Sequence, residues 1–241
     1  MGESDSYDRG EAVKIEILQD AALAAHEAAK VIAASARDAV LTRGKFLFAV
    51  SGGRTPWQML RGLARDEVSW KYVHLFQVDE RVAQAGHHDR NLTHIQESLL
   101  SSVPLPNEQL HAMPVEAPDV KTAAAQYASV LQEIAGRPPV LDLVHLGLGS
   151  DGHTASLIPG DPVLEVDDTD VALTGFYQGR RRMTLTYPIL DRARRILWLV
   201  TGSDKRDALV RLRDADASIP AGRVRQENAV ILADCAAVDG V

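Results

Sequence analysis

Cysteine is almost absent from this sequence of 241 residues, because Cys235 is the single one. One cysteine excludes an internal disulfide bond, and it also excludes a metal site built from several thiolates. Stable disulfides belong to oxidising compartments. We therefore expect the protein to work in a reducing environment, with the cytoplasm as its natural location.

Long apolar runs and an excess of positive charge are missing as well. No stretch approaches the roughly 18 apolar residues of a membrane-spanning helix. The opening MGESDSYDRGE has neither the basic nor the apolar region of a signal peptide. The 26 basic and 33 acidic residues give a formal net charge of −7, which is unfavourable for binding nucleic acid or an anionic membrane. We expect neither as a partner.

Common nucleotide and metal motifs are also lacking. There is no Walker loop, and no GxGxxG follows the first predicted strand, so nucleotide binding is disfavoured. His87, His88 and His94 are close in sequence, but no HExxH motif occurs and no cysteine is near them. We therefore expect no bound metal, and the role of these histidines stays open.

What the sequence does contain is an alternation of apolar runs and helical patterns. The expected strands cover residues 13–18, 45–50, 72–78, 139–146, 171–175, 183–186, 195–201 and 229–233, and the expected helices residues 20–42, 55–64, 92–101, 120–135 and 203–213. The first strand is short and is expected at an edge. This pattern predicts an α/β fold, with a mostly parallel sheet covered by helices on both faces. No linker divides the chain, so we expect one domain over residues 1–241, with a polar tail at about 1–11.

The most informative segment is GLGSDGHTASLIP at residues 147–159. It follows an apolar strand, so its turn should lie at the carboxyl end of that strand, where ligands bind in open α/β sheets. Asp151 and His153 lie in this turn, and a histidine beside a carboxylate is a candidate general base near neutral pH. The alternative is that Asp151 caps a helix and His153 is only a polar surface residue.

Two further strands are followed by polar segments. One is SGGRT, which comprises Ser51, Gly52, Gly53, Arg54 and Thr55. Its glycines allow close approach of the backbone to a ligand, and Thr55 followed by proline is typical of a capped helix start. Such a start presents unpaired amides that suit a phosphate or an oxyanion. The same pattern also occurs in ordinary strand-to-helix turns.

The second polar segment is Asp79, Glu80 and Arg81, which follows the strand at 72–78. We expect a polar loop here. An arginine at this edge of the sheet could stabilise a developing negative charge. Alternatively, Arg81 could pair with the neighbouring carboxylates in a structural network.

Basic residues recur late in the chain. Arg180, Arg181 and Arg182 precede a strand, and Lys205 lies in the first turn of a predicted helix. A lysine beside free helix amides can help to hold a phosphate. The alternative is a solvated basic run, which we favour for Arg180 and Arg181. Arg182 and Lys205 are the better candidates for binding.

Taken together, these segments resemble the 6-phosphogluconolactonase family, the lactone hydrolases of the oxidative pentose phosphate pathway. The similar segments come in the family's order: SGGRTP at 51–56, VDER at 78–81 with Asn91 beyond it, GLGSDGHTASLIPG at 147–160, RMTLTYP at 182–188 and TGSDKRDAL at 201–209. Two positions depart from the family pattern. Tyr187 stands where leucine is common, and HHDRN replaces the usual serine–asparagine pattern.

The resemblance implies a modified Rossmann-like fold, shared with glucosamine-6-phosphate deaminases and ribose-5-phosphate isomerases, and no redox cofactor. It implies hydrolysis of 6-phospho-D-glucono-1,5-lactone, with His153 as general base and Asp151 orienting it. Arg81 would lie close to the substrate, and from its charge we expect it to be the partner of the growing oxyanion. The SGGRT loop, Arg182 and Lys205 would hold the phosphate, with Asp79 and Asn91 as further candidate substrate contacts.

Two rival functions follow from the same residues. An isomerase or deaminase would move a proton between carbons, with Asp79 as its base, and deaminases pair the motif histidine with a glutamate shortly after it. Residues 154–160 contain no carboxylate, which favours attack by water. A non-catalytic sugar-phosphate sensor would need a DNA-binding module, for which about a dozen polar residues before the first strand leave no room. The sequence does not fix the oligomeric state, although a monomer is compatible with it.

Overall fold

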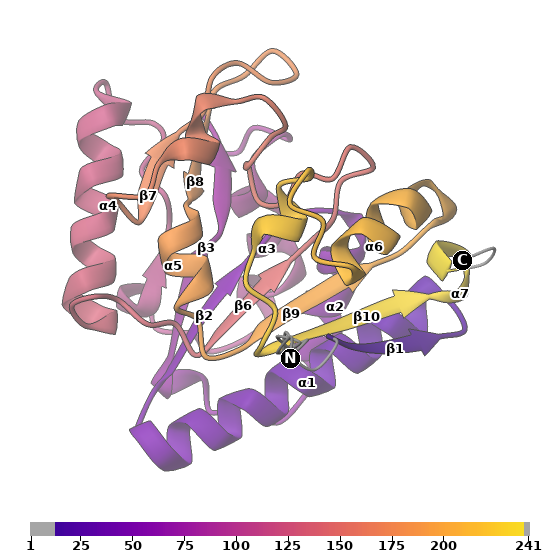
Figure 1. The fold of residues 1–241 in the computed structure, drawn as a ribbon. Coiled ribbons are helices and arrows are strands. Elements are labelled where there is room, and N and C mark those ends of the chain that lie inside the picture. The colour runs from indigo at the N-terminus through magenta and orange to yellow at the C-terminus, as the bar shows by residue number, and fades with distance from the viewer. Residues whose placement is uncertain (1–12, 239–241) are drawn as a thin grey trace, which may run out of the picture.

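The main sheet of the protein has seven strands, and every neighbouring pair is parallel (Figure 1). The computed structural model describes residues 13–238, so the predicted tail at residues 1–11 lies outside it. In spatial order the strands are β1 (Lys14–Leu18), β10 (Ala229–Asp234), β9 (Ile196–Val200), β6 (Leu143–Leu146), β2 (Phe46–Val50), β3 (Val73–Gln77) and β5 (Leu110–His111). The predicted parallel sheet, with the first strand at its edge, is confirmed.

A second, antiparallel sheet of three strands stands beside the first. It contains β4 (Asp79–Arg81), β8 (Arg182–Leu185) and β7 (Val171–Leu173), in that order. The expectation of a polar loop at residues 79–81 is therefore wrong, because Glu80 pairs with Met183 about a hundred residues away. The sequence pattern does predict the two later strands. It does not show that they leave the main sheet.

Helices cover both faces of the main sheet, as expected. They are α1 (Ala21–Arg43), α2 (Arg54–Leu63), α3 (Asn91–Ser98), α4 (Val120–Ala135), α5 (Tyr187–Asp191), α6 (Arg206–Arg213) and α7 (Cys235–Val238). Successive side chains of a strand point to opposite faces. Phe46 and Phe48 of β2 therefore pack with α1, α2 and α3, whereas Leu47 and Ala49 pack with α4, α5 and α6.

The longest helix, α1, illustrates how local sequence forms these elements. Asp20 caps it, since its carboxylate accepts a hydrogen bond from the Leu23 amide at 2.8 Å. It ends at Gly44, whose φ of 76° is a left-handed conformation that glycine adopts easily. Between these ends its buried residues are alanines and Ile32, which let the helix approach the sheet closely.

Several element boundaries differ from the sequence prediction. The strand predicted at 139–146 begins only at Leu143, following Pro138 and Pro139, which cannot donate backbone hydrogen bonds to a ladder. The helix predicted at 203–213 starts as a 3₁₀ turn over Ser203–Lys205 before α6. The short elements α5 and β5 were missed, because so few residues show no periodicity.

The helices of residues 13–238 include none with the length and hydropathy of a membrane-spanning segment.

Candidate active site

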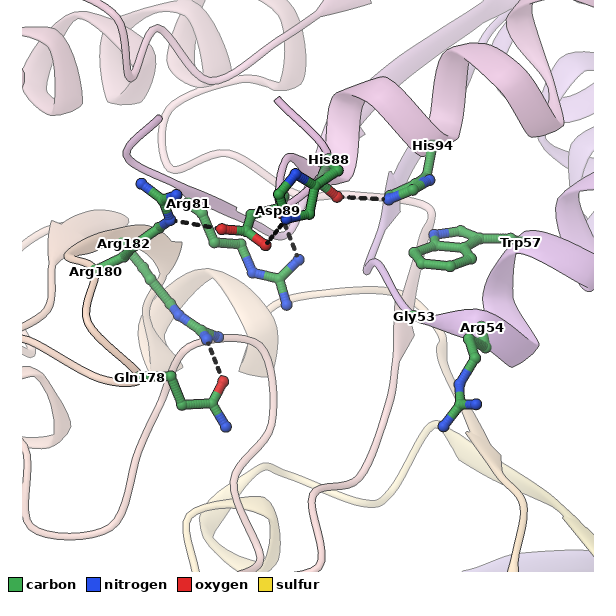
Figure 2. Close-up of a pocket in the computed structure, with 10 residues that line it drawn as sticks. All are labelled: Gly53, Arg54, Trp57, Arg81, His88, Asp89, His94, Gln178, Arg180 and Arg182. Carbon is green, nitrogen blue, oxygen red and sulfur yellow. Dashed lines mark hydrogen bonds and ion pairs between the residues drawn. The ribbon is translucent and has the colours of Figure 1, made fainter. Parts of the chain in front are cut away.

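The segments singled out in the sequence meet at the carboxyl edge of the main sheet. Four of them follow β2, β3, β6 and β9, which are all parallel, and the segment at residues 180–182 leads into β8 of the second sheet. A pocket of about 510 Å³ lies there (Figure 2). It is lined by Gly53, Arg54, Trp57, Arg81, His88, Asp89, His94, Gln178, Arg180 and Arg182. Four arginines face a single carboxylate, so the pocket suits an anionic ligand.

Asp151 and His153 form a hydrogen-bonded pair in the turn after β6. The Nδ1 atom of His153 lies 2.5 Å from Oδ1 of Asp151, which also accepts a hydrogen bond from the His153 amide at 3.1 Å. No helix starts at Asp151, so the capping alternative is excluded. With its proton on Nδ1, the imidazole presents the lone pair of Nε2, for which the described residues provide no partner. This is the arrangement of a general base with an orienting carboxylate.

The surroundings of Asp151 keep it ionised. Burial would raise the pKa of this carboxyl group, but the hydrogen bonds from His153 and Tyr177 outweigh that effect, so the pKa lies below its usual value. The Tyr177 hydroxyl donates to Oδ2 at 3.2 Å. Both oxygens of Asp151 are therefore in use.

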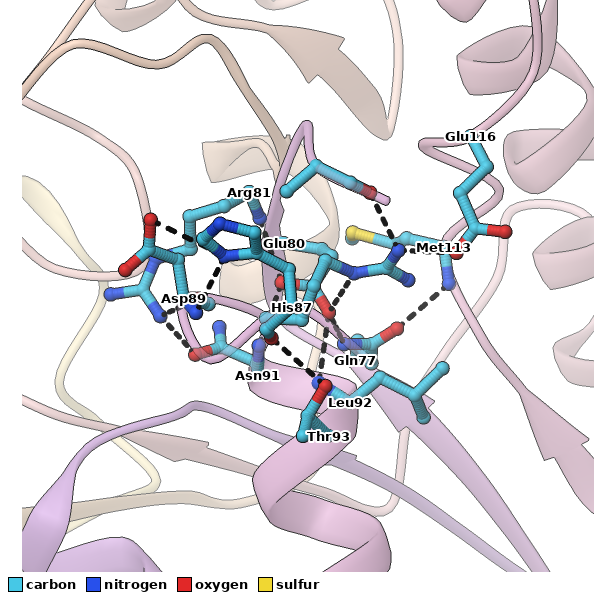
Figure 3. A network of polar contacts seen from close by, with 12 residues as sticks. Gln77, Glu80, Arg81, His87, Asp89, Asn91, Leu92, Thr93, Met113 and Glu116 are labelled. Carbon is cyan, nitrogen blue, oxygen red and sulfur yellow. Dashed lines mark hydrogen bonds and ion pairs between the residues drawn. The ribbon is translucent and has the colours of Figure 1, made fainter. Parts of the chain in front are cut away.

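Arg81 is held by a network of polar contacts that includes Asp89 and Asn91 (Figure 3). Its NH1 group donates to the carbonyl of Asp89 at 3.1 Å and to Oδ1 of Asn91. The side-chain amide nitrogen of Asn91 in turn donates to the backbone oxygen of Asp79 at 2.9 Å and to Oδ1 of Asp79 at 3.2 Å. Asn91 and Asp79 are almost fully buried and do not line the pocket. They position Arg81.

Gly52 belongs to the same network. A β-carbon at this position would lie 1.8 Å from Oδ1 of Asn91, so no larger residue fits beside that amide. The sequence pattern predicts that this glycine allows close approach of a ligand. The structure gives a different reason, namely close approach of Asn91.

Glu80 serves the fold and not the pocket. It is completely buried, and its carboxylate accepts hydrogen bonds from the backbone amides of Arg81, Asn91 and Leu92. Asn91 and Leu92 form part of the first turn of α3, where a negative charge is favourable. Its charge is balanced by Arg90, whose Nε lies 3.1 Å away. The alternative, in which the Arg81 guanidinium pairs with its neighbouring carboxylates, is not what the structure shows. Among residues 13–238, Arg81 forms no ion pair, and its charge faces the pocket.

Arg182 lies across the pocket from Arg54 (Figure 2). Its NH2 group donates to Oε1 of Gln178 at 3.2 Å, and its NH1 group lies 3.5 Å from the Ser156 hydroxyl. That hydroxyl donates to Oδ2 of Asp79 at 2.6 Å. Ser156 therefore joins the turn that carries His153 to the network that holds Arg81.

The SGGRT loop and Lys205 contribute less directly than expected. Ser51 donates to the carbonyl of His145 at 3.0 Å, and the Thr55 hydroxyl pairs with that of Thr201 at 2.7 Å instead of capping α2. Within this loop, only Gly53 and Arg54 line the pocket. Lys205 lies outside the lining and pairs with Asp204 at 3.0 Å.

The histidine cluster lies on the pocket wall. Ligand atoms of His87, His88 and Asp89 are all within 4.8 Å of one another. Arg180 already contacts two of these ligand atoms. Its Nε lies 2.7 Å from Oδ2 of Asp89, and its NH2 group lies 3.1 Å from Nε2 of His87. A guanidinium in this position opposes binding of a cation. His94 stacks on Trp57, with ring centroids 3.9 Å apart.

Sequence reasoning missed several of the residues at this site. The predicted solvated basic run is wrong for Arg180, which lines the pocket and pairs with Asp89, whereas Arg181 is exposed as expected. Tyr177 and Gln178 come from the hairpin between β7 and β8, where no motif marked them. Ser156 had a visible signal, because it lies within the segment at 147–159, and Asp89 had one because it lies within HHDRN.

The chain is similar to known proteins over most of its length. The family model described as glucosamine-6-phosphate isomerases/6-phosphogluconolactonase matches residues 19–232. The 6-phosphogluconolactonase of Synechocystis is 39% identical over 175 residues, which cover 71% of this chain and 72% of that protein. That of Mycobacterium tuberculosis is 36% identical over 234 residues, covering 91% of this chain and 95% of the relative.

A solved structure of a similar protein has the same fold. The crystal structure of 6-phosphogluconolactonase from Thermotoga maritima matches with a TM-score of 0.81 and 26% identity, and the match covers 92% of this chain and 98% of that one. The family model spans most of the present chain. The chain therefore belongs to the family of glucosamine-6-phosphate isomerases and 6-phosphogluconolactonases.

Proposed function

We propose that this protein is a 6-phosphogluconolactonase, which hydrolyses 6-phospho-D-glucono-1,5-lactone to 6-phosphogluconate in the pentose phosphate pathway. The relatives that cover most of the chain carry that name. The observation that carries the proposal is the pair of Asp151 and His153, which Tyr177 joins to Arg182 in the wall of a pocket lined by four arginines. This site offers a base for water and positive charge for a phosphorylated substrate.

The proposed reaction needs no covalent intermediate with the protein. Nε2 of His153 takes a proton from a water molecule while the water oxygen bonds to C1 of the lactone. The carbonyl oxygen gains negative charge, and the Arg81 guanidinium stabilises it. The tetrahedral species then collapses, the bond between C1 and the ring oxygen breaks, and the imidazolium returns its proton to that oxygen. Asp151 stabilises the imidazolium throughout.

The phosphate end of the substrate is assigned to the remaining positive groups. Arg54 and the free amides at the start of α2 provide donors on one side of the pocket, and Arg182 provides a planar guanidinium on the other. Lys205 follows β9 in the same region and adds positive potential. Its pairing with Asp204 weakens that contribution.

The isomerase or deaminase alternative is disfavoured by the position of the base that it requires. Asp79, the base required for proton transfer between carbons, has both carboxylate oxygens occupied by Asn91 and Ser156 and lies behind the pocket wall. In addition, residues 154–160 contain no carboxylate to pair with His153. Activation of water remains the chemistry that these residues support best.

The test is to generate the lactone in situ with glucose-6-phosphate dehydrogenase and to measure hydrolysis above the spontaneous rate. We expect the protein to accelerate hydrolysis strongly. A parallel incubation with glucosamine 6-phosphate should release no ammonia. Ammonia release without lactone hydrolysis would replace the proposal with a deaminase, and tight binding of sugar phosphates without turnover would favour a sensor.

A further inference from the structure

The hairpin between β7 and β8 carries a tyrosine that contacts both halves of the site. Its turn residues Gln178 and Gly179 have φ values of 53° and 77°, and Tyr177 and Arg180 on either side exchange backbone hydrogen bonds of 2.9 and 3.2 Å. Two successive positive φ values are typical of a tight two-residue hairpin turn. The turn therefore fixes the direction in which Tyr177 points.

The hairpin is also anchored to the loop that precedes α3. Arg180 pairs with Asp89, with Nε and Oδ2 separated by 2.7 Å. Asp89 belongs to the loop that supplies a carbonyl to Arg81. Tyr177 is consequently held in place by the turn and by this ion pair.

The hydroxyl of Tyr177 acts on the acid–base pair. It donates to Oδ2 of Asp151 at 3.2 Å, while Oδ1 of the same carboxylate accepts the two hydrogen bonds from His153. The carboxylate is thus fastened at both oxygens and cannot rotate away from the imidazole. The tyrosine ring also contacts the His153 ring edge-on, with centroids 5.8 Å apart.

The ring of Tyr177 acts on Arg182. The guanidinium carbon of Arg182 lies 5.0 Å from the ring centroid, which is within the range of a cation–π interaction. The neighbouring Gln178 accepts a hydrogen bond from the same guanidinium. Arg182 is buried, so these contacts replace hydration that it has lost.

We infer that Tyr177 is a positioning residue of the lactonase site, whose hydroxyl orients Asp151 and His153 and whose ring places Arg182 for the substrate. The inference rests on the proposed function. Burial and the nearby Asp151 carboxylate raise the pKa of Tyr177, so the hydroxyl keeps its proton and remains a donor at neutral pH.

The two contacts can be separated by two substitutions. Tyr177→Phe removes the hydroxyl and keeps the ring, so kcat should fall about fivefold with KM near the parent value. The acidic limb of the pH profile should move up by about half a pH unit, because Asp151 then stabilises the imidazolium more strongly. Tyr177→Leu also removes the ring, and we expect KM to rise about fivefold in addition.

Phe176→Leu is the matched control, because Phe176 is 79% exposed on the same hairpin and does not line the pocket. It should leave kcat, KM and the pH profile unchanged. Tyr177→Phe with the parent's kcat and pH profile would overturn the inference. Equal losses in all three variants, with an unmoved pH profile and lower melting temperatures, would also overturn it, since they would show a merely structural hairpin.

The parent protein is assayed first, which separates this inference from the proposed function. A parent that does not accelerate lactone hydrolysis refutes the function itself. An active parent that Tyr177→Phe matches in every parameter refutes only the role of Tyr177.

Discussion

The two ends of the candidate active site are built in different ways. At the base end, His153 and Asp151 lie in a turn, and their side chains are 26% and 39% exposed. At the arginine end, Arg81 depends on Asn91 and Asp79, which are 1% and 4% exposed. Buried polar groups are costly to leave without partners, whereas exposed groups can turn to water. The base end should therefore affect chemistry alone, and the arginine end should affect both chemistry and stability.

The largest effect is expected for His153→Ala at the base end. Removal of a positioned general base should lower kcat/KM by a factor of about 10² to 10⁴. The melting temperature should stay close to that of the parent, because the side chain is partly exposed. Lactone hydrolysis corrected for the spontaneous rate, together with a thermal melt, provides the measurement. A well-folded variant with the parent's efficiency would disprove the assignment of the base.

Arg81→Gln should have the next largest effect. Loss of a positive group at the developing oxyanion typically costs about 10² to 10³ in kcat. Arg37→Gln on the exposed side of α1 is a matched control and should leave kcat unchanged. If Arg81→Gln raises only KM, Arg81 contacts the phosphate and not the carbonyl. The lactone would then bind with its phosphate at Arg81.

Gly52→Ala tests the buried network without touching a charged group. The new methyl group collides with Asn91, so we expect kcat/KM to fall about tenfold and the free energy of unfolding to fall by about 1–3 kcal/mol. The double variant with Asn91→Ala should be less destabilised than the sum of the two single variants. If the two changes in the free energy of unfolding, measured with urea, are strictly additive, the new methyl group does not collide with Asn91.

The smallest effect concerns the strand that leads to the base end. His145 in β6 is fully buried, neither ring nitrogen has a partner among the described residues, and burial lowers its pKa to about 3. Below its ordinary pKa, the unfolded chain binds a proton that the folded protein does not. Folding stability should therefore decline as the pH falls from about 6.5 towards 3, by at most about 1.4 kcal/mol per pH unit.

His145→Leu removes this proton linkage. The stability difference between variant and parent should grow by on the order of 2 kcal/mol between pH 7.5 and pH 5, in favour of the variant. Urea unfolding at the two pH values measures it. If parent and variant lose stability equally on acidification, His145 is not responsible for acid sensitivity.

Each element that could be predicted from the sequence depends on neighbours in the chain. The pair Asp151 and His153 is two residues apart and follows an apolar strand, so its place at the sheet edge follows from parallel topology. Arg54 and Arg81 likewise follow parallel strands and lie at the same edge. The predicted bounds of helix α4, residues 120–135, are confirmed at both ends.

The residues that escaped prediction depend on partners far away in the chain. Ser156 and Asp79 are 77 positions apart, and Arg180 and Asp89 are 91 apart. These contacts exist because β8 pairs with β4 and so places the hairpin that carries Tyr177 over the pocket. Short antiparallel strands leave too little periodicity to reveal their partners. Local sequence thus specified the chemical groups and the edge of the sheet, and long-range pairing specified which group each one touches.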